Sequence, residues 1–232
     1  MSVNEVTDSI KDLNINDDKE DKNMSEKQQE QEQEQEQEQE SIINELKKLL
    51  HNDKDHKKEI LKLKTIKDAH IYCKINNLTG QQMGPLIEFY IKEKSCMEKN
   101  KAGDCIGDCK DRFLEDNEIK ASGGGKKHNS YNYVQIRLNH KLHNYIFTAY
   151  YLTEDNYMNG GELFIFKIKK ENLYSLLNEY GAYAHGTVSK LGKITLEDLK
   201  KDNNTKEYSL RPKYGDKLWK ELIEYRVNES DL

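Results

Sequence analysis

The first 40 residues of the chain carry too few apolar side chains to build a core, so the fold must come from the residues that follow. Gln and Glu alternate from Gln29 to Glu40, and residues 1–40 contain 14 acidic and 4 basic residues. Such a composition cannot offset the entropy lost on ordering, which predicts a disordered acidic tail. A polar helix that continues into Ile42–Leu50 is the alternative interpretation.

Removing this tail from the count reverses the sign of the charge. The whole chain of 232 residues has a net charge of −5, whereas residues 41–232 hold 33 basic and 28 acidic groups, a balance of +5. A mildly basic body is compatible with a polyanionic partner but does not require one. The length fits one domain of roughly 150–200 residues plus an appendage.

Nothing in the sequence predicts a membrane or secretory protein. No apolar run approaches the roughly 18 residues of a membrane span, and the acidic N-terminus lacks the apolar stretch of a signal peptide. The four cysteines, Cys73, Cys96, Cys105 and Cys109, are therefore expected to be reduced thiols. We expect an intracellular protein, cytoplasmic or nuclear, with no membrane partner and no small-molecule organic cofactor.

Helical periodicity dominates the first half of the body. Apolar residues in 42–76 predict an N-terminal helical segment over 41–76, of one or two helices with a break at 51–53, which caps the fold or mediates dimerisation. Pro85 is well placed in the first turn of a further helix. That helix has an apolar face that includes Ile87 and Tyr90, and Glu88 lies on this face or at its edge.

Beyond this helix the pattern becomes extended. Strands are predicted at 117–122, 131–138, 145–152 and 162–168, followed by helices at 170–180 and near 195–200. The turn residues Asn159-Gly160-Gly161 predict that the last two strands form an antiparallel pair. The order predicts an α/β (α+β) layer fold around one sheet, with 77–232 as the main domain.

The strand at 117–122 carries the most informative chemistry. Alternation sends Glu118 and Lys120 to one face and Ile119 to the core. Asp108 precedes Glu118 by ten residues, a spacing that suits a tight hairpin bringing both carboxylates together. Two carboxylates that hold a metal ion, with an ammonium group beside them, are what hydrolysis of a phosphodiester requires.

Magnesium is the expected metal because it takes oxygen ligands and only one or two carboxylates. Asp108 and Glu118 are the candidate ligands, the carbonyl of Ile119 adds a third oxygen, and Glu88 is placed to orient a water. Asp104, in a second Gly-Asp-Cys tripeptide, is the alternative to Asp108. The nearby residues Asp111, Glu115 and Asp116 are expected in a solvated turn.

These motifs resemble those of the PD-(D/E)xK nuclease superfamily, and they are most similar to those of type II restriction endonucleases. The resemblance rests on Gly107-Asp108, Glu118-Ile-Lys-Ala-Ser122, Gly123-Gly-Gly125 and Asn132-Tyr-Val-Gln-Ile-Arg137, with the preceding helix motif Gly84-Pro-Leu-Ile-Glu88. It covers roughly residues 78–190 and implies a restriction-endonuclease-like mixed β-sheet flanked by helices. It also implies a Mg²⁺ requirement and cleavage of double-stranded DNA. Glycine, rather than the proline of the motif, precedes each candidate Asp.

Several residues are candidate DNA contacts because of their type and neighbourhood. Three glycines followed by two lysines suit close approach to phosphate, and His, Asn and Tyr side chains reach base edges or sugars. Each group also has a purely structural alternative. Residues 123–131 would be a flexible basic loop, Gln135 and Arg137 would be surface residues whose polar groups have protein partners, and His185 and Thr187 would cap a turn. The candidates are Lys126, Lys127, His128, Asn129, Tyr131, Gln135, Arg137, His185 and Thr187.

The sequence therefore predicts a Mg²⁺-dependent endonuclease, a homodimer if it cuts both strands symmetrically. A structure-selective repair or recombination nuclease and a catalytically inactive DNA-binding protein of the same fold are the alternatives. A zinc site made by Cys96, Cys105, Cys109 and His128 is a further alternative, although these residues form no CxxC pair.

Overall fold

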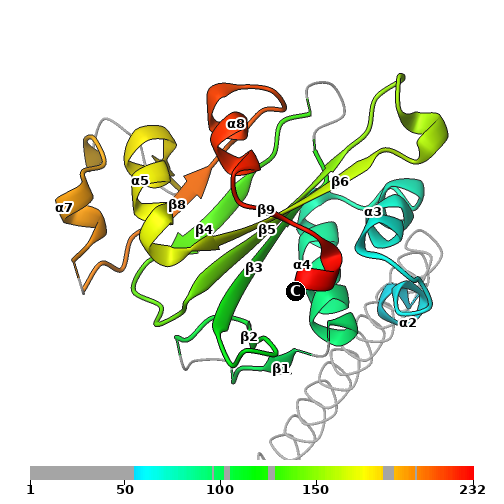
Figure 1. Cartoon of the computed structure of the whole chain (residues 1–232), viewed down its shortest axis with the longest axis horizontal. Helices are drawn as coiled ribbons and strands as arrows, with labels where there is room; N and C mark the ends of the chain where they lie inside the picture. The colour runs from blue at the N-terminus through cyan, green and yellow to red at the C-terminus, as the bar shows by residue number, and fades with distance from the viewer. Residues whose placement is uncertain (1–54, 96, 102–104, 125–128, 185–190, 202) are drawn as a thin grey trace, which may run out of the picture. The chain divides into compact units, whose positions relative to one another are not determined.

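The structure, a computed structural model, describes residues 55–95, 97–101, 105–124, 129–184, 191–201 and 203–232. Asp55–Leu232 form one compact unit of mixed α/β architecture (Figure 1). The predictions made for residues 1–54 lie outside the described residues. The domain boundary expected near residue 77 is not seen, because 55–76 pack into the same core as the helix that follows.

Helices come first in the described part of the chain, strands predominate over residues 98–169, and helices and strands alternate after that. In chain order they are α2 (His56–Ile60), α3 (Ile66–Ile75), α4 (Gly80–Lys94), β1 (Glu98–Lys99), β2 (Cys109–Lys110), β3 (Asp116–Ser122), β4 (Tyr133–Arg137), β5 (Asn144–Tyr151), η1 (Tyr157–Asn159), β6 (Glu162–Lys169), α5 (Lys170–Tyr180), β7 (Ala182–Tyr183), α7 (Leu196–Leu199), β8 (Glu207–Leu210), α8 (Lys217–Ile223), β9 (Arg226–Val227) and η2 (Glu229–Asp231).

The main sheet has the strand order β1-β2-β3-β5-β6-β9 and is mixed. β3 and β5 run parallel, whereas the other neighbours are antiparallel. The strands predicted from alternation at 117–122, 145–152 and 162–168 are present as β3, β5 and β6. The antiparallel pairing predicted for the last two is confirmed. Because β5 lies between two long strands, all but its last residue are buried.

The expectation of a single sheet is wrong. The strand predicted at 131–138 forms as β4, but it belongs to a second, three-stranded sheet of order β4-β8-β7. Tyr133 pairs with Leu210 and Ile136 with Tyr208, so β4 carries one extra residue between these pairs, a β-bulge. Alternation predicted the strand, but the choice of partner depends on β8, some 70 residues further along the chain.

Two apolar cores lie on the two faces of the main sheet. On one face Ile119 and Ile146 pack with residues of α3 and α4, and on the other Phe147 and Phe166 pack with residues of α5 and with Trp219. Figure 1 shows α3 and α4 on one side of the sheet and α5 on the other. This division places α4 directly against β3, the strand predicted to carry the site.

Helix α4 starts earlier than predicted. It begins at Gly80, where the side chain of Gln82 accepts a hydrogen bond of 3.0 Å from the N–H of Thr79. Pro85 therefore lies inside the helix and not in its first turn. Because proline has no N–H, the carbonyl of Gln81 loses its usual helical donor. The apolar face is as predicted, since Leu86, Ile87, Tyr90 and Ile91 are buried.

The turn between β2 and β3 also differs from expectation, because Asp111 is buried and not solvated. Its carboxylate accepts hydrogen bonds from the N–H groups of Phe113 at 2.9 Å and Glu115 at 3.1 Å. It also forms an ion pair of 2.8 Å with Lys167 of β6. Burial by itself would raise the pKa of Asp111, but these donors hold it below its usual value. Glu115 and Asp116 are half-buried.

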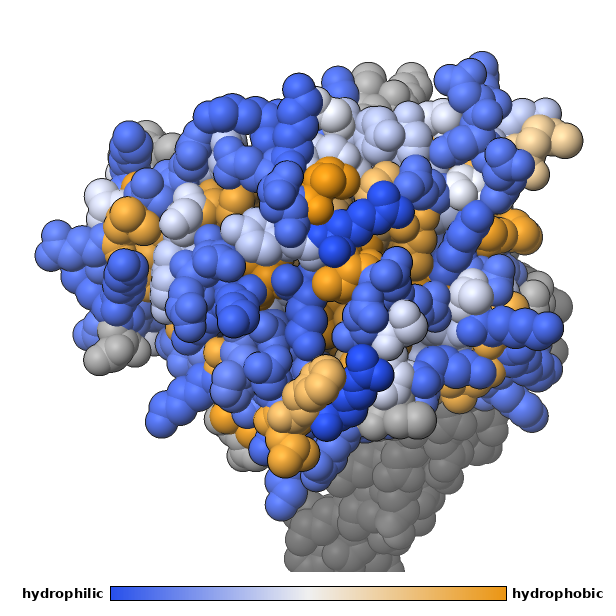
Figure 2. All heavy atoms as spheres, viewed as in Figure 1, coloured by the Kyte–Doolittle hydropathy of each residue, from blue (hydrophilic) through white to orange (hydrophobic). Residues whose placement is uncertain are grey.

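Charged and polar residues cover most of the face shown in Figure 2, and apolar residues gather there in separate groups. Within the residues described, no helix combines the length and the apolar character that crossing a membrane demands.

Trp219 should contribute strongly to stability. It is 3% exposed and its ring lies 5.1 Å from Tyr131, 4.9 Å from Phe164 and 5.4 Å from Phe166. Trp219→Ala should lower the free energy of unfolding by about 3–5 kcal/mol, because it leaves a cavity. Tyr157→Ala, at a side chain 61% exposed, is the control and should change it by less than about 0.5 kcal/mol. Urea denaturation followed by circular dichroism measures both, and similar losses would contradict the packing described.

Candidate functional site

Glu118 and Lys120 lie next to each other on β3. The two side chains share one face of the strand, and their charged groups form an ion pair of 2.7 Å between Lys120 Nζ and Glu118 Oε1. Glu118 is 6% exposed, and Ile119 between them is fully buried on the opposite face. The alternation predicted from sequence therefore holds, and it leaves a nearly desolvated acid–amine pair at the edge of the sheet.

Asp108 reaches the same strand through its backbone and its carboxylate. Its N–H donates to the carbonyl of Asn117 at 2.7 Å, and its Oδ2 accepts from the N–H of Ile119 at 2.9 Å. Gly107 permits this approach: its φ is +87°, and a Cβ there would lie 2.7 Å from the Asn117 carbonyl oxygen. The glycine that replaces the motif's proline thus has a local reason. Asp104, the alternative ligand, lies outside the described residues.

The backbone of Ile119 adds a further oxygen at this edge. In a strand, the N–H and C=O of one residue point to the same side. β2 pairs with β3 only at Asp116 and Asn117, so Ile119 lies beyond the end of that pairing. Because its N–H is bonded to Asp108, its carbonyl faces the same edge as the Asp108 carboxylate. This is the oxygen predicted from the sequence as a third metal ligand.

Glu88 approaches the group from α4. Burial raises the pKa of this carboxyl to about 7, Lys120 and Lys92 lower it, and Asp108 and Glu118 raise it. Burial would by itself lower the pKa of Lys120, but Glu118, Glu88 and Asp108 hold it above its usual value. Residues from the segment before β2, from β3 and from α4 are therefore close enough to shift one another's pKa values.

Two residues that sequence reasoning did not single out also contact the carboxylates. Lys92 Nζ lies 3.6 Å from Asp108 Oδ1, and His140 Nδ1 lies 3.7 Å from Glu118 Oε2. Lys92 had a signal, because it follows Glu88 by four residues and so shares its helix face. His140 had none, since it lies between β4 and β5 and comes to Glu118 only through the tertiary fold.

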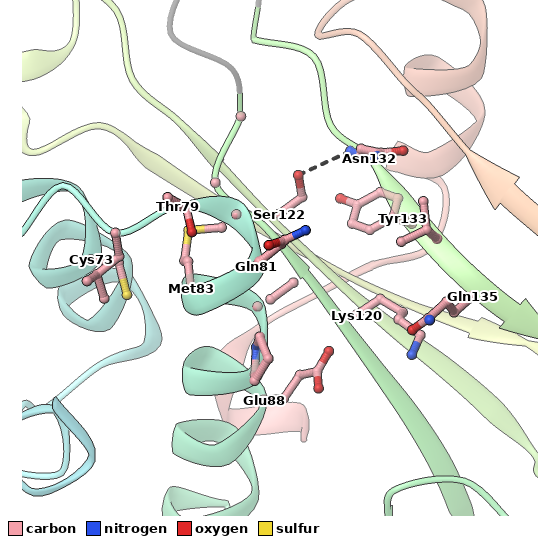
Figure 3. A pocket seen from close by; sticks show the side chains of 18 of the residues that line it. Cys73, Thr79, Gln81, Met83, Glu88, Lys120, Ser122, Asn132, Tyr133 and Gln135 are labelled. Carbon is pink, nitrogen blue, oxygen red and sulfur yellow. Dashed lines mark hydrogen bonds between the residues drawn. The ribbon is translucent and has the colours of Figure 1, made fainter. Parts of the chain in front are cut away.

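A cleft of about 800 Å³ adjoins these groups, between α4 and β4. Figure 3 shows Glu88 on α4 and, across from it, Lys120 on β3 and Gln135 on β4. Ser122 forms part of its wall and accepts a hydrogen bond of 3.1 Å from the N–H of Asn132. A Cβ at Gly123 would lie 2.5 Å from the sulfur of Met83, so the flexible end of that side chain would have to shift to admit it.

The predicted DNA contacts occupy different environments. Gln135 is exposed and lines the cleft, and Asn129 is half-buried in the loop before β4. Arg137 instead forms an ion pair of 2.6 Å with Glu207, the alternative of a satisfied surface pair. Tyr131 is 1% exposed and stacks on Trp219, so a DNA contact through this ring does not fit the structure. The remaining candidates, Lys126, Lys127, His128, His185 and Thr187, lie outside the described residues.

The oxygens at the edge of β3 suit a hard cation. In the part of the chain that the structure describes, no group of three or more His, Cys, Asp or Glu side chains is placed to hold a metal. Magnesium does not require one, since it is held by one or two carboxylates and keeps several waters. The zinc alternative is not favoured at Cys109, which is buried 3.3 Å from the sulfur of Met97. Cys96 and His128 lie outside the described residues.

Comparison with known proteins gives no match: no protein-family model, no curated protein and no solved structure is similar to this chain.

Glu88 predicts a pH dependence of stability. Its pKa is about 7 in the folded state against an ordinary 4.5, so between these values the folded state binds more protons than the unfolded state. The free energy of unfolding contributed by this group therefore falls as pH rises through that window, by at most about 3 kcal/mol. Glu88→Gln should remove this fall, measured by urea denaturation between pH 5 and pH 8 without divalent cations.

Glu93→Gln is the matched control for this measurement, because Glu93 lies on the same helix but is exposed. Its stability should follow that of the unmodified protein across the pH range. A Glu88→Gln curve parallel to both would show that this carboxyl titrates in its ordinary range.

Proposed function

We propose that this chain is a Mg²⁺-dependent endonuclease that hydrolyses phosphodiester bonds of double-stranded DNA, with a restriction-endonuclease-like fold. One observation carries the proposal: the carboxylate of Asp108 is hydrogen-bonded to the amide of Ile119, next to the ion-paired Glu118 and Lys120. Three neighbouring residues of one strand edge thus offer carboxylate, carbonyl and ammonium groups together. The resemblance to PD-(D/E)xK nucleases supports the same assignment.

The oxygens of Asp108, Glu118 and the Ile119 carbonyl would hold the Mg²⁺ ion. The donor set fits, because it contains only oxygen and each carboxylate keeps one oxygen outside the short hydrogen bonds described above. When bound, Mg²⁺ supplies positive charge that makes water more acidic and offsets negative charge on the phosphate.

Lys120 stabilises the phosphate. Its ammonium group has three donors, one of which is given to Glu118, so two can reach phosphate oxygens. The pKa of Lys120 is raised, which keeps the group charged at neutral pH. As water attacks phosphorus, negative charge grows on the non-bridging oxygens of the phosphate. A fixed ammonium group in a largely desolvated site lowers the energy of this transition state.

Glu88 orients water and exchanges protons. Hydrolysis forms one bond between water oxygen and phosphorus and breaks one ester P–O bond, so the water must lose a proton and the leaving oxygen must gain one. With a pKa of about 7, the Glu88 carboxyl is present in both protonation states at neutral pH. A group with that property accepts or donates a proton efficiently.

A type II restriction activity is the finer form of the proposal. Cutting both strands symmetrically takes two active sites, which a homodimer provides, and the helical segment of 41–76 is the candidate interface. The rivals are a structure-selective repair nuclease and an inactive DNA-binding protein of the same fold. Comparing intact, nicked and branched DNA separates the first rival, and Mg²⁺-dependent cleavage of a plasmid separates the second.

Removing either charge of the pair should abolish cleavage. Glu118→Gln and Lys120→Met should each lower the rate of Mg²⁺-dependent plasmid nicking by at least about 100-fold, because the first removes a proposed ligand of the metal ion and the second removes the cation that stabilises the phosphate. Chelation of Mg²⁺ by EDTA should have the same effect on the unmodified protein. The measurement is the conversion of supercoiled plasmid to nicked and linear forms, with circular dichroism to establish that each variant is folded.

Glu93→Gln is again the control, since it removes an exposed carboxylate of the neighbouring helix. It should cleave at the unmodified rate. If a folded Glu118→Gln or Lys120→Met variant retained that rate, the assignment of a nuclease site to β3 would have to be abandoned.

A further inference from the structure

The cleft between α4 and β4 begins at the candidate catalytic groups. Glu88, Lys120 and Ser122 line it (Figure 3), and Gly123 and Gly124 also belong to its lining. Whatever occupies the cleft therefore lies next to the phosphate on which the proposed nuclease acts. The residues that line the cleft consequently indicate which part of a substrate binds beside the reacting bond.

Those walls are poor in positive charge. Of the described residues that line the cleft, only Lys74, Glu88 and Lys120 are charged, and no arginine is among them. The Lys74 ammonium already donates to the Gly124 carbonyl at 3.1 Å. Binding of a phosphate backbone relies on cations, because phosphate contacts come mainly from Arg and Lys. Among the described lining residues, Lys120 is therefore the cation best placed to bind a phosphate.

The walls instead carry amides that suit a base edge. Gln81 and Gln135 both line the cleft, and in the described part of the chain neither side-chain amide is engaged in a hydrogen bond. A carboxamide offers a donor and an acceptor side by side, which is how Gln and Asn pair with adenine.

Backbone strain marks one of these amides. Gln135 has a φ of +56°, in the left-handed region that a residue with a side chain seldom adopts. It lies in the bulge of β4, between the pairs made by Tyr133 and Ile136. Bulges often redirect a side chain next to a functional site, and such strain persists only where the surroundings impose it. Here the bulge presents the Gln135 amide in the cleft.

The volume of the cleft suits one nucleotide. It is about 800 Å³, within the roughly 300–1,000 Å³ of pockets that hold a single small molecule. Met83 and Pro85 on one wall and Val134 on the other provide apolar surface for the faces of a flat ring.

We infer that the cleft binds one unstacked nucleobase, adjacent to the phosphate held by Lys120, and that Gln81 and Gln135 contact the edge of that base. The inference rests on the proposed function, because it takes the ligand to be part of a DNA substrate. A base inside a duplex reaches the cleft only after unpairing and unstacking, which costs least at an unpaired position. The protein therefore binds DNA with an unpaired nucleotide in preference to continuous duplex.

Equilibrium binding tests the cleft without any cleavage. The probes are three fluorescein-labelled versions of one short duplex: fully paired, with one unpaired nucleotide, and with an abasic residue in place of that nucleotide. Anisotropy is measured in EDTA at low salt, so that no DNA is consumed. The unmodified protein should bind the duplex with the unpaired nucleotide about tenfold more tightly than either other probe, because only that probe offers a free base edge.

The double substitution Gln81→Ala with Gln135→Ala should reduce this preference to about one. A circular dichroism spectrum that matches that of the unmodified protein shows that the variant is folded. Asn203→Ala removes an exposed amide from the loop after α7 and is the matched control. It should retain the preference. A preference near one in the unmodified protein, or one that survives the double substitution, overturns the inference.

The outcome is separable from that of the nuclease proposal. If the preference is present and no Mg²⁺-dependent cleavage occurs, the cleft binds a base in a DNA-binding protein that is not a nuclease. If cleavage depends on Glu118 and Lys120 but the preference is absent, the nuclease stands and the cleft has no such ligand. If both hold, preferential cutting beside the unpaired nucleotide identifies the structure-selective nuclease named above as a rival, in place of the restriction-type enzyme.

Discussion

The edge of β3 is the constraint on which the site depends. β2 is two residues long and pairs with β3 only as far as Asn117. Beyond that point the backbone groups of Ile119 have no neighbouring strand on that side, and an exposed strand edge of this kind is open to pairing with another chain. The carboxylate of Asp108 takes the Ile119 N–H at 2.9 Å. One hydrogen bond thus closes the edge and brings a second carboxylate to the strand that already bears Glu118.

Local pattern predicted the elements on which this edge is built. Alternation along 117–122 gave the strand, the burial of Ile119 and the shared face of Glu118 and Lys120, because the pleat of a strand leaves no other choice. The ten-residue spacing between Asp108 and Glu118 predicted the hairpin that β2 and β3 form. The antiparallel β5–β6 pair and helix α5 were likewise evident from turn residues and periodicity. These features depend on neighbours in sequence, and for that reason a single sequence carries them.

Features that depend on distant partners were not predictable in this way. β4 joins a second sheet because β8 is its partner, and Tyr131 is buried because Trp219 stacks on it. Asp111 is buried because Lys167 of β6 reaches it across the sheet. For Tyr131 and Asp111 the expected position was at the surface, and a partner more than 50 residues away reversed it. His140 comes to Glu118 by the same kind of long-range contact, and its sequence neighbours gave no indication of it.

The net charge of the site depends on the four predicted residues together with their neighbours. Asp108, Glu118 and Glu88 bring three carboxyl groups together, and Lys120 and Lys92 bring two amines. With all groups ionised, three carboxylates against two ammonium groups would leave one excess negative charge in a largely buried place. The raised pKa of Glu88 lets a proton make up that difference. With a divalent cation bound, the cluster no longer requires this proton. The cation leaves an excess of positive charge, which a phosphodiester anion offsets. The same set of residues is therefore close to neutral both in the protonated form and with a cation and a phosphate bound.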